Sequence, residues 1–231
     1  MEVLVGNYNL HEEGSDKYSL RGRVFTKIRE DILTGVYKTD DAIIESQVAK
    51  EFGVSRTPVR EALRQLELEE LVVIIPNKGA IVTGINGKDI QDIYMIRSLI
   101  EGLAAKMAAI EMSKEEIESL DEIIILSEFH LEKRNMDKLY ELDGRFHEML
   151  YDGSKSKILR HVLSDFHHYV QRVRKESLSS LERAQHSIDE HKKIFEAIKG
   201  RNPDLAESLT NQHVQLTIEN VYKRKITDQF I

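Results

Sequence analysis

Apolar residues in the first part of the chain recur at the spacing of a helix that buries one face. Within residues 20–34, Val24, Ile28 and Ile32 lie four positions apart, so each stands about one turn beyond the last. Gly35 follows directly, and glycine commonly ends a helix. The pattern predicts an amphipathic helix over residues 20–34.

The next segment predicts two shorter helices joined by a tight turn. The first covers residues 45–53 and ends at Gly53, a typical residue just past a helix C-terminus. The second begins after Arg56, with Thr57 as its cap and Pro58 at its first position, where a missing N–H costs nothing. Its buried face would comprise Val59, Leu63 and Leu66. Two short helices separated in this way form a helix-turn-helix.

Two β-rich runs follow, at residues 71–75 and 80–83. The sequence Pro76-Asn77-Lys78-Gly79 lies between them and is rich in turn-forming residues. The segment therefore predicts a hairpin, or wing, with the cation Lys78 at its tip.

Three arginines, Arg56, Arg60 and Arg64, recur every four residues along the helix after the turn. Most of its acidic residues come at the far end, with Glu67 and Glu69 among them. A basic N-terminal half suits a recognition helix, because that half enters the major groove of DNA between phosphates. This distribution favours DNA binding over an ordinary solvated face.

The rest of the chain shows helical periodicity without a strand pattern. Cap signals occur at Ser113-x-x-Glu116, Asn135 and Asn202-Pro203. They divide the segment into six predicted helices, at residues 88–111, 114–133, 136–152, 156–178, 181–199 and 203–226. The predicted fold class is mainly α, with an N-terminal winged helix-turn-helix followed by an all-α helical bundle.

These elements suggest a tail over residues 1–17, a DNA-binding domain over 18–84 and a helical domain over 85–231. The net charge is −7, but residues 18–84 carry equal numbers of basic and acidic side chains, so the acidity lies elsewhere. No cysteine is present, which excludes disulfides and thiolate metal sites. No apolar run approaches the roughly 20 residues that span a bilayer. We expect a cytoplasmic protein with no membrane partner.

Two acid–base side chains lie on one face of the helix predicted at residues 136–152. Asp143 and His147 are four positions apart, beside the apolar residues Leu142, Phe146 and Leu150. Such a pair can be half of a metal site, a catalytic pair or a packed polar contact.

Two further histidines fall on buried faces. His191 is spaced with Ile188 and Phe195, and His213 with Leu209. One inward histidine is more often a hydrogen-bonded core residue than a ligand. Several inward polar groups in one bundle are costly unless satisfied, and a single metal ion satisfies them together.

One carboxylate and three imidazoles suit one divalent transition metal, namely Zn, Ni, Mn, Co or Fe. Four protein ligands leave up to two octahedral positions open, whereas tetrahedral zinc would have none.

The sequence GVSRTPVREALRQLELEELV, followed by PNKGAIV, closely resembles the winged helix-turn-helix of GntR-family transcription regulators. The resemblance implies that Arg56 and Arg60 contact DNA and that Thr57 helps to hold a phosphate. It also implies that Lys78 and Gly79 place the wing tip in the minor groove. The family often has an arginine early in the second helix, where this chain has Ser46.

A second resemblance covers the helical segment. Asp143-Gly-Arg-Phe-His147, Glu190-His191 and His213 are similar to the FCD effector domain of the FadR branch of that family. The resemblance implies that Asp143, His147, His191 and His213 bind one metal ion. Residues 93–109 are similar to the first effector helix, and the resemblance implies that Arg97 faces the cavity.

The effectors of that branch are mostly small carboxylates. An inward Arg97 needs an anion, which either an organic acid or Glu101, one turn away, would supply.

Three functions remain after these arguments. The first is a ligand-responsive regulator, expected to be a repressor, that binds operator DNA as a homodimer and a small organic acid at the metal. The second is a metallohydrolase, which needs a general acid or base, and only Glu101 and His168 are candidates. The third is a regulator with a purely structural metal. The missing base and the DNA-binding segment favour the first function, not an enzyme.

Overall fold

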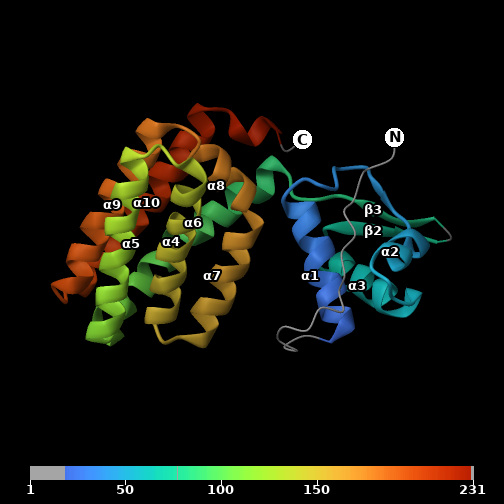
Figure 1. Cartoon of the computed structure of the whole chain (residues 1–231), viewed down its shortest axis with the longest axis horizontal. Helices are drawn as coiled ribbons and strands as arrows, with labels where there is room; N and C mark the ends of the chain where they lie inside the picture. The colour runs from blue at the N-terminus through green and yellow to red at the C-terminus, as the bar shows by residue number, and fades with distance from the viewer. Residues whose placement is uncertain (1–18, 77, 230–231) are drawn as a thin grey trace. The chain divides into compact units, whose positions relative to one another are not determined.

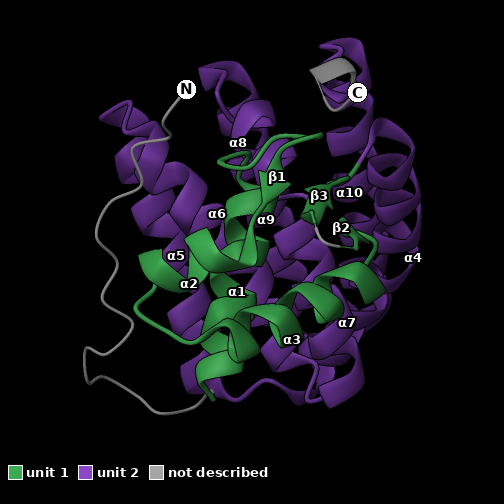
Figure 2. Ribbon diagram, turned by 90° about the vertical axis from the view of Figure 1, so that its right-hand side faces the viewer, with its two compact units in different colours: residues 1–85 green, residues 86–231 purple. Residues whose placement is uncertain are grey.

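The structure, a computed structural model, describes residues 19–76 and 78–229. These residues form two compact units that meet in sequence between Ile85 and Asn86 (Figure 2). The tail predicted at residues 1–17 and Asn77 of the predicted wing turn lie outside the described residues.

In its described residues, the first unit has three helices and a small antiparallel sheet (Figure 1). The helices are α1 (Leu20–Leu33), α2 (Glu45–Glu51) and α3 (Arg56–Leu68). The strands are β1 (Ala42–Ile43), β2 (Val72–Ile75) and β3 (Gly79–Val82), in the order β1-β3-β2. The predicted winged helix-turn-helix is confirmed.

Its core follows the predicted periodicity. Val24 and Ile28 of α1 and Val59 and Leu66 of α3 are fully buried, and α1 packs on α3. The turn between α2 and α3 contains Gly53 at φ 65°, in the left-handed region that glycine enters without steric cost. The residue types at these positions therefore account for the local fold.

Two details of this unit differ from the prediction. Helix α3 begins at Arg56 with Ser55 as its N-cap, so Thr57 is a first-turn residue rather than the cap. Strand β1 was not predicted, because a pair such as Ala42–Ile43 is too short to show an alternating pattern. It exists because β3 offers it a free edge.

Strand β1 explains why Gly79 must be glycine. Gly79 has φ 96°, and a Cβ atom there would lie 2.5 Å from the carbonyl oxygen of Ile43. Both the backbone conformation and the close approach of β1 exclude a side chain. Gly79 therefore shapes the wing, whatever it contributes to DNA binding.

The second unit is all-α, as predicted. Its helices are α4 (Gly87–Glu111), α5 (Lys114–Glu132), α6 (Met136–Gly153), α7 (Lys157–Tyr169), α8 (Gln171–Ser177), α9 (Leu181–Lys199) and α10 (Pro203–Lys223), followed by the 3-10 helix η1 (Ile226–Gln229). The predicted caps are present: Ser113 forms a capping box with Glu116, and Asn135 and Asn202 accept bonds from the first turns of α6 and α10.

The helix predicted at residues 156–178 is two helices in the structure. Val170, at ψ 11°, ends α7 and precedes α8. The sequence continues its apolar spacing through this point, so periodicity alone did not reveal the break. The break matters because α8 carries Arg174 into the interior of the bundle, where it is 4% exposed.

Helices α4 and α10 pack along each other and carry much of the core (Figure 1). They approach closely at Gly102, where a Cβ atom would lie 2.0 Å from the side-chain oxygen of Asn211. Ala105 and Ala109, three and seven residues beyond Gly102, continue this face of α4 and are buried. This close approach brings the interior faces of the two helices together. Among the described residues, no helix has the length and apolar content that a membrane span requires.

Replacing Gly79 by alanine should destabilise the protein by about 2–5 kcal/mol, because left-handed strain and a backbone clash act together. Gly53→Ala is the matched control: it also has positive φ, but a Cβ atom there would have no atom of the described residues within 4 Å. It should cost only the strain of about 1–2 kcal/mol. Urea unfolding of both variants measures the difference, and equal costs would contradict the β1 contact.

Candidate functional site

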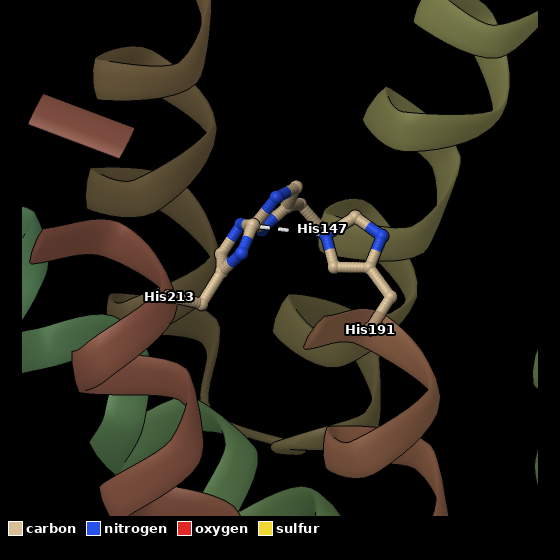
Figure 3. Close-up of side chains that lie close together, drawn as sticks. All are labelled: His147, His191 and His213. Atoms are coloured by element: carbon tan, nitrogen blue, oxygen red, sulfur yellow. Dashed lines mark hydrogen bonds between the residues drawn. The ribbon is translucent and has the colours of Figure 1, made fainter. Parts of the chain in front are cut away.

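Three histidines from three helices converge inside the second unit. His147 of α6, His191 of α9 and His213 of α10 are each at most 4% exposed. Figure 3 shows their imidazoles turned toward one another, and one ring nitrogen of each lies within 4.8 Å of the others. The sequence predicted this convergence, and the geometry is compatible with one shared metal ion.

The ring of His213 is oriented by a carboxylate. Its Nδ1 lies 2.6 Å from Oε2 of Glu190, which Arg183 holds with two bonds of 2.8 and 3.0 Å. Burial opposes ionisation of Glu190, but the hydrogen bonds from His213 and Arg183 outweigh it and lower its pKa to about 2. The Nδ1–H of His213 therefore donates to Glu190, and its Nε2 faces Nε2 of His191 at 3.3 Å. An outer carboxylate of this kind is typical of metal-binding histidines.

The other two imidazoles are held in their neutral form. Burial lowers the pKa of His147 and of His191 below the ordinary histidine value. His191 stacks on Phe146, with ring centroids 4.0 Å apart. Neutral imidazole is the form that binds metals, so burial prepares both residues as ligands.

Asp143 lies beside the histidines, with Oδ1 at 3.8 Å from Nε2 of His191. Its Oδ2 accepts a hydrogen bond from Arg174, which also contacts His167. Burial raises the pKa of Asp143, but the neighbouring positive charge of Arg174 outweighs this effect and keeps the carboxyl ionised. Asp143 therefore presents one oxygen to the histidines and the other to an arginine.

Arg97 is buried on α4, in agreement with the inward position that the family resemblance implies. One guanidinium nitrogen donates to Oε1 of Glu101 at 3.0 Å, which is the structural ion pair that the spacing allowed. Its Nε and Nη1 have no hydrogen-bond partner within residues 19–76 and 78–229. Arg97 thus keeps donors for a second anion.

A small cavity lies beside the histidines, with about 20 Å³ of free space. Side chains from α4, α6, α8, α9 and α10 line it, among them Tyr94, Arg97, Asp143, His147, Arg174 and His213. In this state the cavity has room for about one water-sized molecule.

The two candidate general acids or bases differ in position. Glu101 is buried and bonded to Arg97 and to the hydroxyl of Tyr151. His168 is exposed on α7, whereas the adjacent His167 is buried beside Arg174. His168 was therefore the wrong choice of the two neighbours, because the helix turns it toward solvent.

The positions of Arg174 and Arg183 beside the histidines were not predicted from the sequence. Arg183 and Glu190 are seven residues apart on one helix, so two-turn spacing was a usable signal. Arg174 offered no such signal, because its position depends on the break at Val170.

Four of the five candidate DNA-binding residues are exposed on the first unit, and the fifth, Gly79, is partly buried. Arg56, Thr57 and Arg60 lie on the N-terminal part of α3, and Lys78 lies in the turn between β2 and β3. Arg60 pairs with Glu45 at 3.2 Å, with half of its side chain exposed. Ser46 is exposed on α2, next to Glu45.

Two family profiles match the chain. Residues 20–82 match "Bacterial regulatory proteins, gntR family", and residues 92–216, more than half of the chain, match "FCD domain". The chain belongs to the GntR family. It is a transcription regulator of the branch with an FCD domain, whose presence indicates a response to a ligand.

Individual proteins agree with this membership. The uncharacterized HTH-type transcriptional regulator YdhC of Bacillus subtilis is 32% identical over 82% of this chain and 84% of its own. The gluconate operon transcriptional repressor of the same organism is 28% identical over 89% and 88%. The solved structure of Escherichia coli McbR/YncC has the same fold, with a TM-score of 0.73 at 20% identity over 90% of this chain and 99% of that one.

We predict that this GntR-family protein binds about one divalent metal ion per chain. His213→Ala should lose most of the metal. Glu190→Gln keeps all the candidate ligands but disturbs the orientation of His213 and the pairing of Arg183, so it should weaken binding by about 10–100-fold. His168→Ala, an exposed histidine, is the control and should bind normally. Elemental analysis measures the metal content of the unsubstituted protein and the three variants, and titration after chelator treatment measures their metal affinity.

The affinity for the metal should also decrease as the pH is lowered, because protons compete with the metal for the imidazoles. Burial lowers the pKa of His147 and His191 below 6.5, so we expect the fall to lie below that pH. Absence of metal uptake in the unsubstituted protein would contradict the site.

Proposed function

We propose that this GntR-family regulator is a repressor that binds its operator as a homodimer. A small carboxylate bound at a divalent metal ion in the helical unit releases it from the DNA. The convergence of three imidazoles on one point, with Asp143 beside them, carries the proposal.

Asp143, His147, His191 and His213 would hold the metal. Their one oxygen and three nitrogen ligands suit Zn, Ni, Mn, Co or Fe. The bound ion would supply positive charge that attracts a carboxylate oxygen to a position the protein leaves open. Glu190 fits this role as well, because it fixes the tautomer of His213 that leaves Nε2 free.

Arg97 supports a carboxylate as the effector. Two nitrogens of its buried guanidinium lack a partner among the described residues, which favours an anion, and a carboxylate matches their geometry. The gluconate operon repressor is named for a carboxylate, which is consistent with this chemistry.

The exposed face of α4 supports a homodimer. Met95, Leu99 and Leu103 recur every four residues and are 40–69% exposed, so they form an apolar stripe that water would disfavour. A second copy is the expected occupant, because helix-turn-helix dimers bind two half-sites related by two-fold symmetry.

On DNA, we propose that Arg56 and Arg60 contact the major groove, Thr57 a phosphate, and Lys78 with Gly79 the minor groove.

Arg60→Ala should cost about 1–3 kcal/mol of operator binding and relax discrimination at one base position, if Arg60 reads a base. Arg64→Ala is the matched control, since Arg64 is equally exposed one turn further along α3. It should weaken binding to all sequences alike. Fluorescence anisotropy at fixed salt with specific and random duplexes separates the two effects, and an unchanged Arg60→Ala variant would remove this residue from the interface.

Binding of the carboxylate effector should weaken operator binding by about 5–150-fold, the range expected when two binding sites are coupled by about 1–3 kcal/mol. Operator must then weaken acid binding by the same factor, because coupling between two sites is reciprocal. Titrating acid into metal-loaded protein with and without saturating operator measures this. The His213→Ala variant should lose the response to the acid. It is a better test than Asp143→Ala, because that substitution would also leave Arg174 buried without its partner.

Equal acid affinity in the two titrations would contradict the regulatory role and leave a purely structural metal. Turnover of the acid or of its esters would instead support the metallohydrolase.

A further inference from the structure

The charges around the histidines are balanced before any metal binds. Three arginines lie there, and each is paired with one carboxylate: Arg97–Glu101, Arg174–Asp143 and Arg183–Glu190. Five of these six residues are at most 9% exposed, and Glu190 is largely covered. Imidazoles that bind a metal are neutral, so the cluster as a whole carries no net charge.

A divalent metal ion adds two positive charges to this buried group. An uncompensated charge in a protein interior costs several kcal/mol, so anions are favoured there. A monocarboxylate offsets one of the two charges. An acid with two ionised groups offsets both.

The cavity also has donors for a second acid group. The hydroxyl of Tyr94 and two nitrogens of Arg97 are buried and have no hydrogen-bond partner among the described residues. The guanidinium of Arg97 lies 5.0 Å from the centroid of the Tyr94 ring, so these donors lie close together on α4. Both residues line the cavity with Asp143, His147 and His213.

We propose that the effector is a small dianionic acid. One carboxylate binds the metal, and the other is held by the Tyr94 hydroxyl and the free N–H groups of Arg97. This inference rests on the proposed function and narrows its class of ligand.

The size of the cavity restricts the acid further. Its free space of about 20 Å³ is close to that of one water molecule. A diacid therefore enters only when lining side chains move, and a short chain between the two carboxylates needs the least movement.

The experiment compares acids that differ only in the charge of the second group. Calorimetry on the full-length, metal-loaded protein uses malonate, succinate and malate against their monoamides, which have nearly the same shape. The best-bound diacid should bind about 10–100-fold more tightly than its monoamide, the effect expected of one charge-assisted contact in a buried site.

Two variants locate the second group. Tyr94→Phe removes a hydroxyl that has no partner in the described part of the chain, so it should leave thermal stability unchanged or raised while reducing the diacid preference. Arg97→Met should reduce the preference further. Tyr140→Phe is the control, because its hydroxyl bonds to the backbone oxygen of Gln171 and Tyr140 does not line this cavity.

Three outcomes separate the inference from the proposed function. If diacids and monoamides bind equally well and both release the DNA, the inference of a dianionic effector is wrong, but the proposed function is retained. If the diacid preference survives in Tyr94→Phe and in Arg97→Met, the assigned donors are wrong. If no acid binds metal-loaded protein, the proposed effector site fails as well.

Discussion

An ionised side chain loses several kcal/mol of hydration when it leaves water, unless an opposite charge or a hydrogen-bond partner replaces that water. The interior of the helical unit meets this constraint with paired charges. Arg174 with Asp143 and Arg183 with Glu190 flank the histidines from different helices. These pairs fix the side chains around the cluster, so the candidate metal site depends on them as much as on the ligands.

The same constraint explains why the imidazoles are ready to bind a metal. Burial disfavours the protonated forms of His147 and His191, and Glu190 accepts the Nδ1–H of His213 and so leaves its other nitrogen free. The close approach of α4 and α10 at Gly102 is part of the same arrangement, because Arg97 and His213 lie on those two helices. A close contact between two helices thus helps to place a polar site.

The DNA-binding unit uses charge in the opposite way. Its arginines stay exposed on α3, where pairing with Glu45 or Glu61 is weak and easily exchanged for a phosphate or a base. The wing depends on Gly79, whose conformation allows β1 to join the sheet. One unit therefore keeps charges exposed to a partner, whereas the other pairs each arginine beside its histidines with a carboxylate.

The fold class, most helix boundaries and the inward direction of the four candidate ligands could be predicted from residue patterns alone. Helical spacing and caps such as Ser113 and Asn202 are local signals, so they are visible without a structure. Strand β1, the break at Val170 and the choice of His167 over His168 for the interior were decided only by the tertiary structure. Each depends on a neighbour distant in sequence: β1 needs the edge of β3, and Arg174 meets Asp143 only because α8 turns toward α6. Local patterns encode which face of an element is buried, whereas packing alone decides which side chains meet there.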